Sequence, residues 1–430
     1  MGLFERIDEV KLGLLGASYR SRPWAIAALA FVTLGFARGI HSSFGVFYVA
    51  LLDTFGWSRA ITAGVFSVVL IVDAVVSPIV GHLLDRFGPK KVVGAGCLLL
   101  TAGLLLSSRI ESLWEFYLFF GLVSALGLSF MGMIPHVVLV SEWFLTKRAS
   151  ALGVVYSGTG IGILLLAPLS EWLISTWGWE RALQTLAVAV FTVLLPLVLT
   201  LYRRGPYTGK TSGGSESRNQ WTARLALHSL QFWLLFFARI FAAGGTTVIV
   251  THQVAHVVDI GYSRLYAATI FGFVGIASTC GRLVFGYIAD LFSKQAAYTA
   301  NILMTLVGVA ALMVAQDASH PWLLYVYLIF FGIGFGSRAV IFSALSADLF
   351  SGKGFGAILG YAVVSVGVGG ALGSWLGGFF YDISGSYLIS FALSAVVLSL
   401  SDVCVWLATL RRVVAYDQRL WARPSGIENR

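Results

Sequence analysis

Long apolar stretches separated by short polar segments alternate along the whole chain. Each stretch has about 20 residues or more, which is the length that an α-helix needs to cross the hydrocarbon core of a bilayer. The pattern therefore predicts twelve membrane spans, numbered one to twelve in chain order. Their ranges are 23–51, 59–85, 90–108, 112–141, 148–175, 179–202, 229–257, 264–291, 295–316, 321–348, 354–382 and 386–410.

The composition agrees with this pattern and excludes several classes of protein. Of the 430 residues, 58% are hydrophobic and 11% are charged. Soluble domains carry roughly 25% charged residues, so too few charges remain here to cover water-facing surfaces. Soluble enzymes, disordered proteins and disulfide scaffolds are excluded. We predict an all-α membrane protein with twelve transmembrane helices.

The positions of the basic residues predict the orientation in the membrane. Most of the 29 lysines and arginines lie in the tails and in alternate loops, which share one side because the number of spans is even. Cytoplasmic loops carry an excess of Lys and Arg, so both termini are predicted to be cytoplasmic. The net charge of +9 then reflects topology, and no nucleic-acid partner is predicted.

A long polar segment divides the chain into two halves of six spans each. It follows span six and is rich in Gly, Ser and Thr, a composition typical of flexible linkers. The predicted parts are a tail at 1–22, a first six-helix bundle at 23–202, a linker at 203–228, a second bundle at 229–412 and a tail at 413–430.

The two halves also share short motifs. GWSR at residues 56–59 returns as GYSR at 261–264, and GHLLD at 81–85 returns at the same offset as GYIAD at 286–290. Two motifs at one offset indicate an internal repeat. Two pseudo-symmetric bundles of this kind are the architecture of transporters in which one bundle rocks against the other. Later glycines repeat as well: Gly153, Gly160, Gly162 and Gly178 correspond to Gly360, Gly367, Gly369 and Gly385.

The segment between spans two and three, GHLLDRFGPKK at 81–91, resembles the signature loop of the major facilitator superfamily. The resemblance covers essentially the whole chain and implies the major facilitator fold. In such a loop, glycines allow close helix approach, and charged residues can bridge the two bundles at the cytoplasmic face as a latch. The residues that would form this cytoplasmic gate motif are Gly81, Asp85, Arg86, Gly88, Lys90 and Lys91, with Asp290 in the second copy.

Within that superfamily, the chain is similar to the bacterial monocarboxylate-porter branch, which is related to oxalate:formate antiporters. WFLTKRASALG at 143–153 resembles the loop that enters span five, and GWERA at 178–182 resembles the turn that enters span six. Arg282 lies in span eight, where these families place an anion-binding arginine. One turn earlier, animal monocarboxylate carriers place an acid where this chain has Ser278.

Charged residues inside the spans are expected to have a functional or structural role, because each costs about 2.5–3.5 kcal/mol at the centre of a membrane helix on insertion scales. Four arginines and two aspartates make the interior positive. A positive interior favours an anion, and the guanidinium group binds a carboxylate through two parallel hydrogen bonds. These residues are Arg38, Arg239, Arg282, Arg338, Asp73 and Asp402.

Three of these charges are the main candidates for the transport site. Arg282 lies far from the ends of span eight and is predicted to contact the substrate. Arg38 shares a polar stripe of span one with His41, and it either contacts the substrate or pairs with Asp73. Asp73 is central in span two. It either balances Arg38 or carries a proton, because desolvation favours the neutral form of a carboxyl group.

The roles predicted for the other candidates follow from the helix faces and the positions along the spans at which they lie. Arg239 and His252 lie on nearly opposite faces of span seven, so His252 is predicted to line the path while Arg239 has a structural role, paired with Asp402. Arg338 in span ten has either a conformational role or a substrate contact. Tyr156 and Tyr361, near the starts of spans five and eleven, could supply hydroxyl groups to the substrate. Glycines 369, 373 and 377 predict a face for close helix packing.

These features together predict a secondary transporter of a small organic anion, with a monocarboxylate as the first choice. Proton-coupled symport is the leading mechanism, and anion exchange of the oxalate/formate type or export of larger organic compounds are the alternatives. No catalytic motif, phosphate loop or metal cluster is recognisable in the sequence, so neither an enzyme nor a cofactor is predicted. The expected partners are the substrate, a proton and the lipid bilayer, and the expected state is a monomer in the bacterial inner membrane.

Overall fold

A computed structural model describes residues 3–144, 148–203, 205, 223–291, 293–350 and 355–410. This part of the chain is nearly all helical, and twelve of its helical segments are long and apolar enough to cross a membrane. They coincide closely with the predicted spans, which confirms the predicted fold class. Most of the linker predicted at 203–228 and the tail predicted at 413–430 lie outside the described residues.

The first six spans are built from eleven helical elements. They are α1 (Leu3–Ser42), α2 (Phe44–Phe55), α3 (Arg59–Ser107), α4 (Leu113–Phe116), the π-helical segment η1 (Tyr117–Ser124), α5 (Ala125–Phe130), α6 (Met133–Trp143), α7 (Arg148–Trp177), α8 (Trp179–Ala189), the π-helical segment η2 (Val190–Leu194) and α9 (Leu195–Leu201).

The last six spans are simpler, because each is one helix. A short helix, α10 (Ala223–Leu227), precedes them. The spans are α11 (Leu230–Asp259), α12 (Arg264–Leu291), α13 (Lys294–Val314), α14 (Trp322–Leu349), α15 (Phe355–Ser384) and α16 (Leu388–Thr409).

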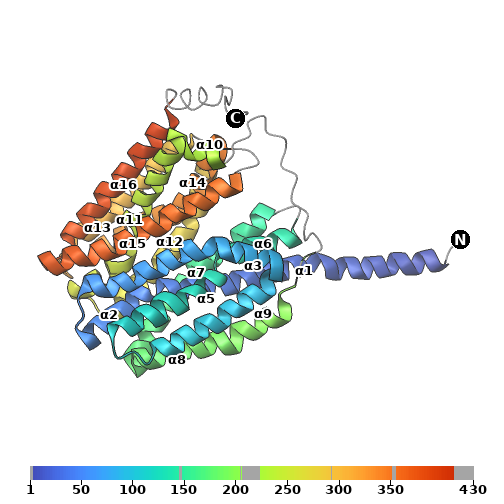
Figure 1. Cartoon of the computed structure of the whole chain (residues 1–430), viewed down its shortest axis with the longest axis horizontal. Helices are drawn as coiled ribbons and strands as arrows, with labels where there is room; N and C mark the ends of the chain where they lie inside the picture. The colour runs from blue at the N-terminus through green and yellow to red at the C-terminus, as the bar shows by residue number, and fades with distance from the viewer. Residues whose placement is uncertain are drawn as a thin grey trace, which may run out of the picture.

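The two sets of spans form two bundles (Figure 1). The first bundle, in blue to green, and the second, in yellow-green to red, lie close together at the end that carries α2. They diverge toward the opposite end, from which the start of α1 projects. We call the end with α2 the outer end, and the end from which the start of α1 projects the inner end.

Turns with left-handed backbone explain part of the internal repeat. Gly56 and Gly261 occupy equivalent positions of the two halves and have φ values of 64° and 105°. Gly178 and Gly385 form a second equivalent pair, with φ values of 88° and 70°. Only glycine adopts this region without a steric penalty from Cβ. Both halves therefore keep glycine where each of these outer turns reverses the chain.

The other repeated glycines sit where helix backbones touch. A Cβ atom on Gly160 in α7 would overlap the backbone of Gly275 in α12, so this glycine lies between the two bundles. Its repeat partner Gly367 in α15 packs in the same way against Ala74 in α3, again across the bundle interface. The predicted packing face of α15 is confirmed: Gly369, Gly373 and Gly377 each pack against α11.

Spans two and three are joined directly at the predicted gate motif. Gly88 has φ 79° and ψ 164° and is followed by Pro89, so the chain turns there within α3. The expected close helix approach at Gly81 is not found among the described residues, because no atom of another helix in this part of the chain lies within 4 Å of a Cβ built there. The bundles diverge at this inner end, which explains the open space.

The charged members of the gate motif are only partly described. Arg86, Lys90 and Lys91 are exposed, and the Arg86 guanidinium lies 5.1 Å from the centre of the Phe87 ring. Both ion pairs found within the described part of the chain lie at the outer end instead. The side chains of Asp85 and Asp290 are outside the described residues.

Candidate functional site

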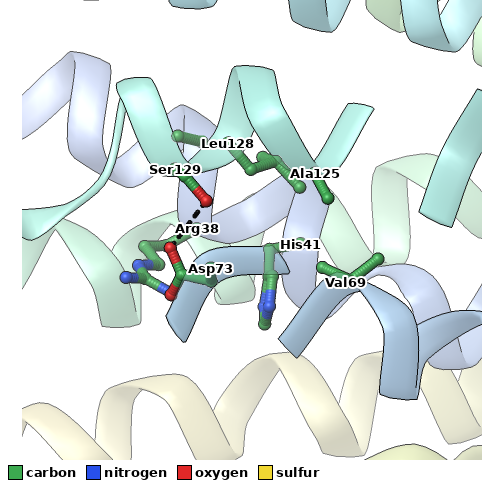
Figure 2. A pocket seen from close by; sticks show the side chains of 8 residues that line it. Arg38, His41, Val69, Asp73, Ala125, Leu128 and Ser129 are labelled. Carbon is green, nitrogen blue, oxygen red and sulfur yellow. Dashed lines mark hydrogen bonds between the residues drawn. The ribbon is translucent and has the colours of Figure 1, made fainter. Parts of the chain in front are cut away.

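Three of the predicted site residues line one small cavity between spans one, two and four (Figure 2). The cavity has a volume of about 10 Å³, which is close to the space that one water molecule requires. It brings the polar stripe of α1 next to the middle of α3 and the end of α5. The lining residues are Ala37, Arg38, His41, Val69, Asp73, Ala125, Leu128 and Ser129.

The Asp73 carboxylate is held by a hydroxyl group. Ser129 Oγ donates a hydrogen bond of 2.8 Å to Asp73 Oδ1 (Figure 2). The alternative of a direct ion pair between Arg38 and Asp73 is not found, since neither of the two ion pairs among the described residues contains them. Ser129 was not predicted as a site residue, because nothing in a single sequence distinguishes it from the other serines in apolar spans.

Arg38 has no described partner for its five N–H donors. Its side chain is half-buried and lines the cavity, and no hydrogen bond or ion pair to it occurs within the described ranges. His41 lines the same cavity as Arg38 and Asp73. Its ring centre is 4.9 Å from that of Phe66. The first bundle thus presents an unpaired guanidinium group at the depth of Asp73.

Arg282 reaches across the interface between the bundles. It lies on α12 in the second bundle, and its Nη1 donates a 2.7 Å hydrogen bond to the carbonyl oxygen of Tyr156 on α7 in the first bundle. Its Nε is 3.3 Å from the carbonyl oxygen of Gly336 on α14. Arg38 lies between Gly35 and Gly39 of α1, which pack against Gly158 and Gly162 of α7, so both arginines border the same helix. Because both of these acceptors are neutral, the charge of Arg282 remains available to an anion.

Arg338 does not join this group. It is buried inside the second bundle, where its donors are taken by the carbonyl oxygen of Ala242 at 3.2 Å and by Thr305 Oγ1 at 3.1 Å. Thr246 and Asn301 supply further acceptors. These contacts tie α14 to α11 and α13. They favour the conformational alternative for Arg338 over a substrate contact.

His252 lies toward the outer end of α11, away from the Arg38 cavity. Its ring is fully buried toward the outer end, packed between Tyr48 and Tyr387 at centroid distances of 5.4 and 5.3 Å. His252 Nε2 donates to the carbonyl oxygen of Ser374 at 2.9 Å. It therefore contributes to the contact of α11 with α15 and with α2, and it does not line the Arg38 cavity. The side chain of Tyr361 is outside the described residues.

The predicted pair of Arg239 and Asp402 is also not found. The Arg239 guanidinium lies 4.8 Å from the centre of the Phe342 ring, while Asp402 accepts a 2.9 Å hydrogen bond from Thr299 Oγ1. A cation over an aromatic face is a stable arrangement in a site with little water. Arg239 therefore keeps the predicted structural role, with a different partner.

Comparison with known proteins agrees with this architecture. A family model described as Major Facilitator Superfamily matches residues 27–342. Monocarboxylate transporter 13 of Rattus norvegicus is 30% identical over 385 residues, which cover 87% of this chain and 86% of that protein. Monocarboxylate transporter 2 of Homo sapiens is 26% identical over 431 residues, covering 94% and 88%.

Solved structures share the fold at low sequence identity. A bacterial homologue of the human lysosomal transporter Spinster, in an inward-facing and unoccupied conformation, superimposes with a TM-score of 0.73. Its identity to this chain is 13%, and the match covers 92% of this chain and 98% of that one. At this identity, the likeness concerns the arrangement of the helices alone.

Proposed function

Since the chain belongs to the major facilitator superfamily of membrane transporters, we propose that it carries a small organic anion across the membrane by alternating access. A monocarboxylate is the leading substrate class, and the names of the relatives support this choice. The proposal includes the predicted setting, in which a monomer lies in a bacterial inner membrane with both termini in the cytoplasm.

The observation that carries this proposal is the Arg38 guanidinium, which has no described acceptor and lies on a helix that packs against α7, the same helix that Arg282 contacts from the second bundle. Two cations within a membrane repel each other and are costly. A carboxylate between them would accept charge-assisted hydrogen bonds from both guanidinium groups. Because Arg38 belongs to the first bundle and Arg282 to the second, one bound anion would connect the two moving parts.

We expect Arg38→Gln and Arg282→Gln each to reduce carboxylate uptake by about tenfold or more. A hydrogen bond to a charged group contributes roughly 1.5–3 kcal/mol, and 1.4 kcal/mol corresponds to about tenfold in binding. Uptake of labelled lactate, pyruvate, formate and oxalate into proteoliposomes measures the change. Arg181→Gln is the matched control, because Arg181 is exposed at the start of α8. Unchanged uptake of every acid by the Arg282→Gln protein would contradict the proposal.

For coupling to protons, we propose Asp73 as the group that is protonated and deprotonated during transport. Its carboxylate lies in the same cavity as Arg38, so its protonation would change the net charge next to the anion. Asp73→Asn should abolish uptake driven by an imposed pH gradient but leave exchange of labelled for unlabelled substrate. Asp317→Asn, in an exposed outer loop, is the control. Full pH dependence in the Asp73→Asn protein would exclude this role and assign proton coupling to another group, whereas a parent protein whose uptake does not respond to a pH gradient would favour anion exchange.

A further inference from the structure

A single buried carboxyl group lies in the outer part of span five. Glu171 of α7 is 3% exposed, and no other acidic side chain is buried in the part of the chain that the structure describes. It takes part in neither of the two ion pairs of the described residues, and no hydrogen bond to it is found among them. A charge in this position would be costly, because a buried carboxylate without a partner loses its hydration.

Glu171 lies on the face of α7 that packs against α12 of the second bundle. Gly160 of α7 packs against Gly275 of α12, and farther along α7, Pro168 packs against Gly272. Positions three or four residues apart share one face of a helix, so Glu171 continues this row toward the outer end. Because the contact positions fall along α12 as they rise along α7, Glu171 lies opposite the first turns of α12.

The internal repeat supports this placement. The residue of α15 that corresponds to Glu171 is Gly378, at the same offset as the later repeated glycines. A Cβ on Gly378 would overlap the backbone of Ala60 at the start of α3, across the bundle interface. Ala60 corresponds to Leu265 at the start of α12, at the offset that relates GWSR to GYSR. Both lines of evidence place Glu171 between the bundles, near the start of α12.

A different acid shows how a carboxylate is held at the corresponding place on the other side of the molecule. Asp382 on α15 accepts hydrogen bonds from the backbone N–H groups of Arg59 at 2.9 Å and Ala60 at 2.8 Å. A negative charge is favourable at this N-terminus of α3. The residue of α7 that corresponds to Asp382 is Ser175, whose hydroxyl group bonds within its own helix. Glu171 lies one turn deeper and has no described donor.

The nearby charges at the outer end are used in two ion pairs between the bundles. Arg264, the first residue of α12, pairs with Asp53 in the last turn of α2. Arg59, the first residue of α3, pairs with Asp259, the last residue of α11, at 2.6 Å from Nη1 to Oδ2. Acid breaks pairs of this kind, because a protonated aspartate no longer attracts an arginine.

The charged residues of the other helices that pack against α7 lie elsewhere. α8 carries Glu180 and Arg181, whose side chains are exposed. α1 packs against the opposite face of α7, at Gly158 and Gly162, and α6 ends at the inner end of the first bundle. The carboxyl group of Glu171 is therefore stable as the neutral acid while the outer end is closed.

We propose that Glu171 is a proton-binding site on the outer side of the protein, which holds a proton while the outer end is closed and releases it to the outside when the bundles separate there. It rests on the proposed alternating access, because only separation of α7 from α12 brings water to this carboxyl group. The proton enters and leaves on the same side, so it is not transported. Acid on the outer side therefore favours the closed outer end, independently of the proton proposed for Asp73.

Distances between the outer ends at a series of pH values test this site. Spin labels replace Arg109 and Gln316, which are exposed in outer loops of different bundles, after Cys97, Cys280 and Cys404 are changed to serine. Electron–electron distance distributions are recorded in nanodiscs without substrate. Raising the pH by one unit should raise the ratio of the long-distance to the short-distance population by up to about tenfold, because the closed state binds one more proton than the open state.

Two variants and the sign of the response assign the effect to one residue. Glu171→Gln imitates the protonated acid, so this protein should stay closed at every pH. Glu180→Gln changes an exposed acid of α8 and should respond like the parent. Protonation of the ion-paired aspartates would open the outer end in acid, which is the opposite sign. A parent that opens in acid or does not respond to pH, or a Glu171→Gln protein that responds like the parent, overturns the proposal.

Infrared spectra detect the proton itself. At neutral pH, the parent should show a C=O stretching band of a protonated carboxyl group that Glu171→Gln lacks and Glu180→Gln keeps. An unchanged band in the Glu171→Gln protein would show that Glu171 is ionised and would overturn the proposal. Because both measurements are made without substrate, absence of carboxylate uptake would contradict the proposed function and leave the proton site at Glu171 intact.

Discussion

Three arginines inside the membrane have the same side chain and different surroundings. Arg38 has no described hydrogen-bond acceptor, Arg282 donates to two backbone carbonyl groups across and beside the bundle interface, and Arg338 is enclosed by acceptors of its own bundle. Sequence position identified all three as unusual, because charges in apolar spans are costly. The sequence alone could not assign different roles to the three arginines, because their hydrogen-bond acceptors come from helices that are far away in the chain.

At Arg338, we expect a loss of stability rather than a loss of substrate affinity. Arg338→Gln leaves several buried acceptors without a donor, which lowers the free energy of unfolding by about 1–3 kcal/mol. Thermal unfolding in detergent measures the change, with Arg181→Gln as the exposed control. The KM of the folded Arg338→Gln protein should equal that of the parent. A large rise in KM without a lower Tm would instead place Arg338 in the transport site.

At the scale of helices, the sequence predicted correctly which membrane spans exist and where along the chain they lie. The twelve spans follow directly from apolar length, and the repeated glycines follow from turns and helix contacts that both halves need. The direction in which a side chain points was less predictable. His252 was placed on the correct helix, but its ring faces Tyr48 and Ser374 near the outer end. The neighbours of a helix face decide such details, and periodicity within one helix does not reveal them.

The glycines of α7 provide a test at this scale. A Cβ on Gly160 would overlap the backbone of Gly275. A Cβ on Gly153, about two turns earlier on the same helix, meets nothing within 4 Å. Gly160→Ala should push α7 from α12 and reduce transport, because backbone cannot move aside as a flexible side chain does. Gly153→Ala should be neutral or raise stability by up to about 1 kcal/mol. Uptake and Tm are measured for both proteins. Equal effects of the two substitutions would contradict the proposal that transport requires the close contact between Gly160 and Gly275.

At the scale of the whole molecule, the structure is closed at the outer end and spread at the inner end (Figure 1). Deeper in the outer half, the bundles are also joined by a side-chain contact: Ser67 Oγ donates to the carbonyl oxygen of Ala371 at 2.7 Å, from α3 to α15. Such contacts must break when the outer end opens. Contacts within one bundle, such as Ser401 Oγ to the carbonyl oxygen of Ala238 at 2.7 Å, need not change.

Two disulfides therefore distinguish motion between bundles from motion within one. In a protein without its native cysteines, Ser67→Cys with Ala371→Cys should abolish transport on oxidation, and a reductant should restore it. Ser401→Cys with Ala238→Cys joins α16 to α11 inside the second bundle and should leave transport unchanged. Uptake before and after oxidation measures both. Transport that survives the first disulfide would show that the bundles do not separate at this contact.

The pairing of Arg59 with Asp259 and of Arg264 with Asp53 has a consequence for how this chain can change over evolution. Each copy of the duplicated motif supplies the arginine for one bond and the aspartate for the other. A substitution in either copy therefore leaves an unpaired charge in the other. We expect the two halves, although free to diverge in their lipid-facing residues, to have coevolved at these four positions.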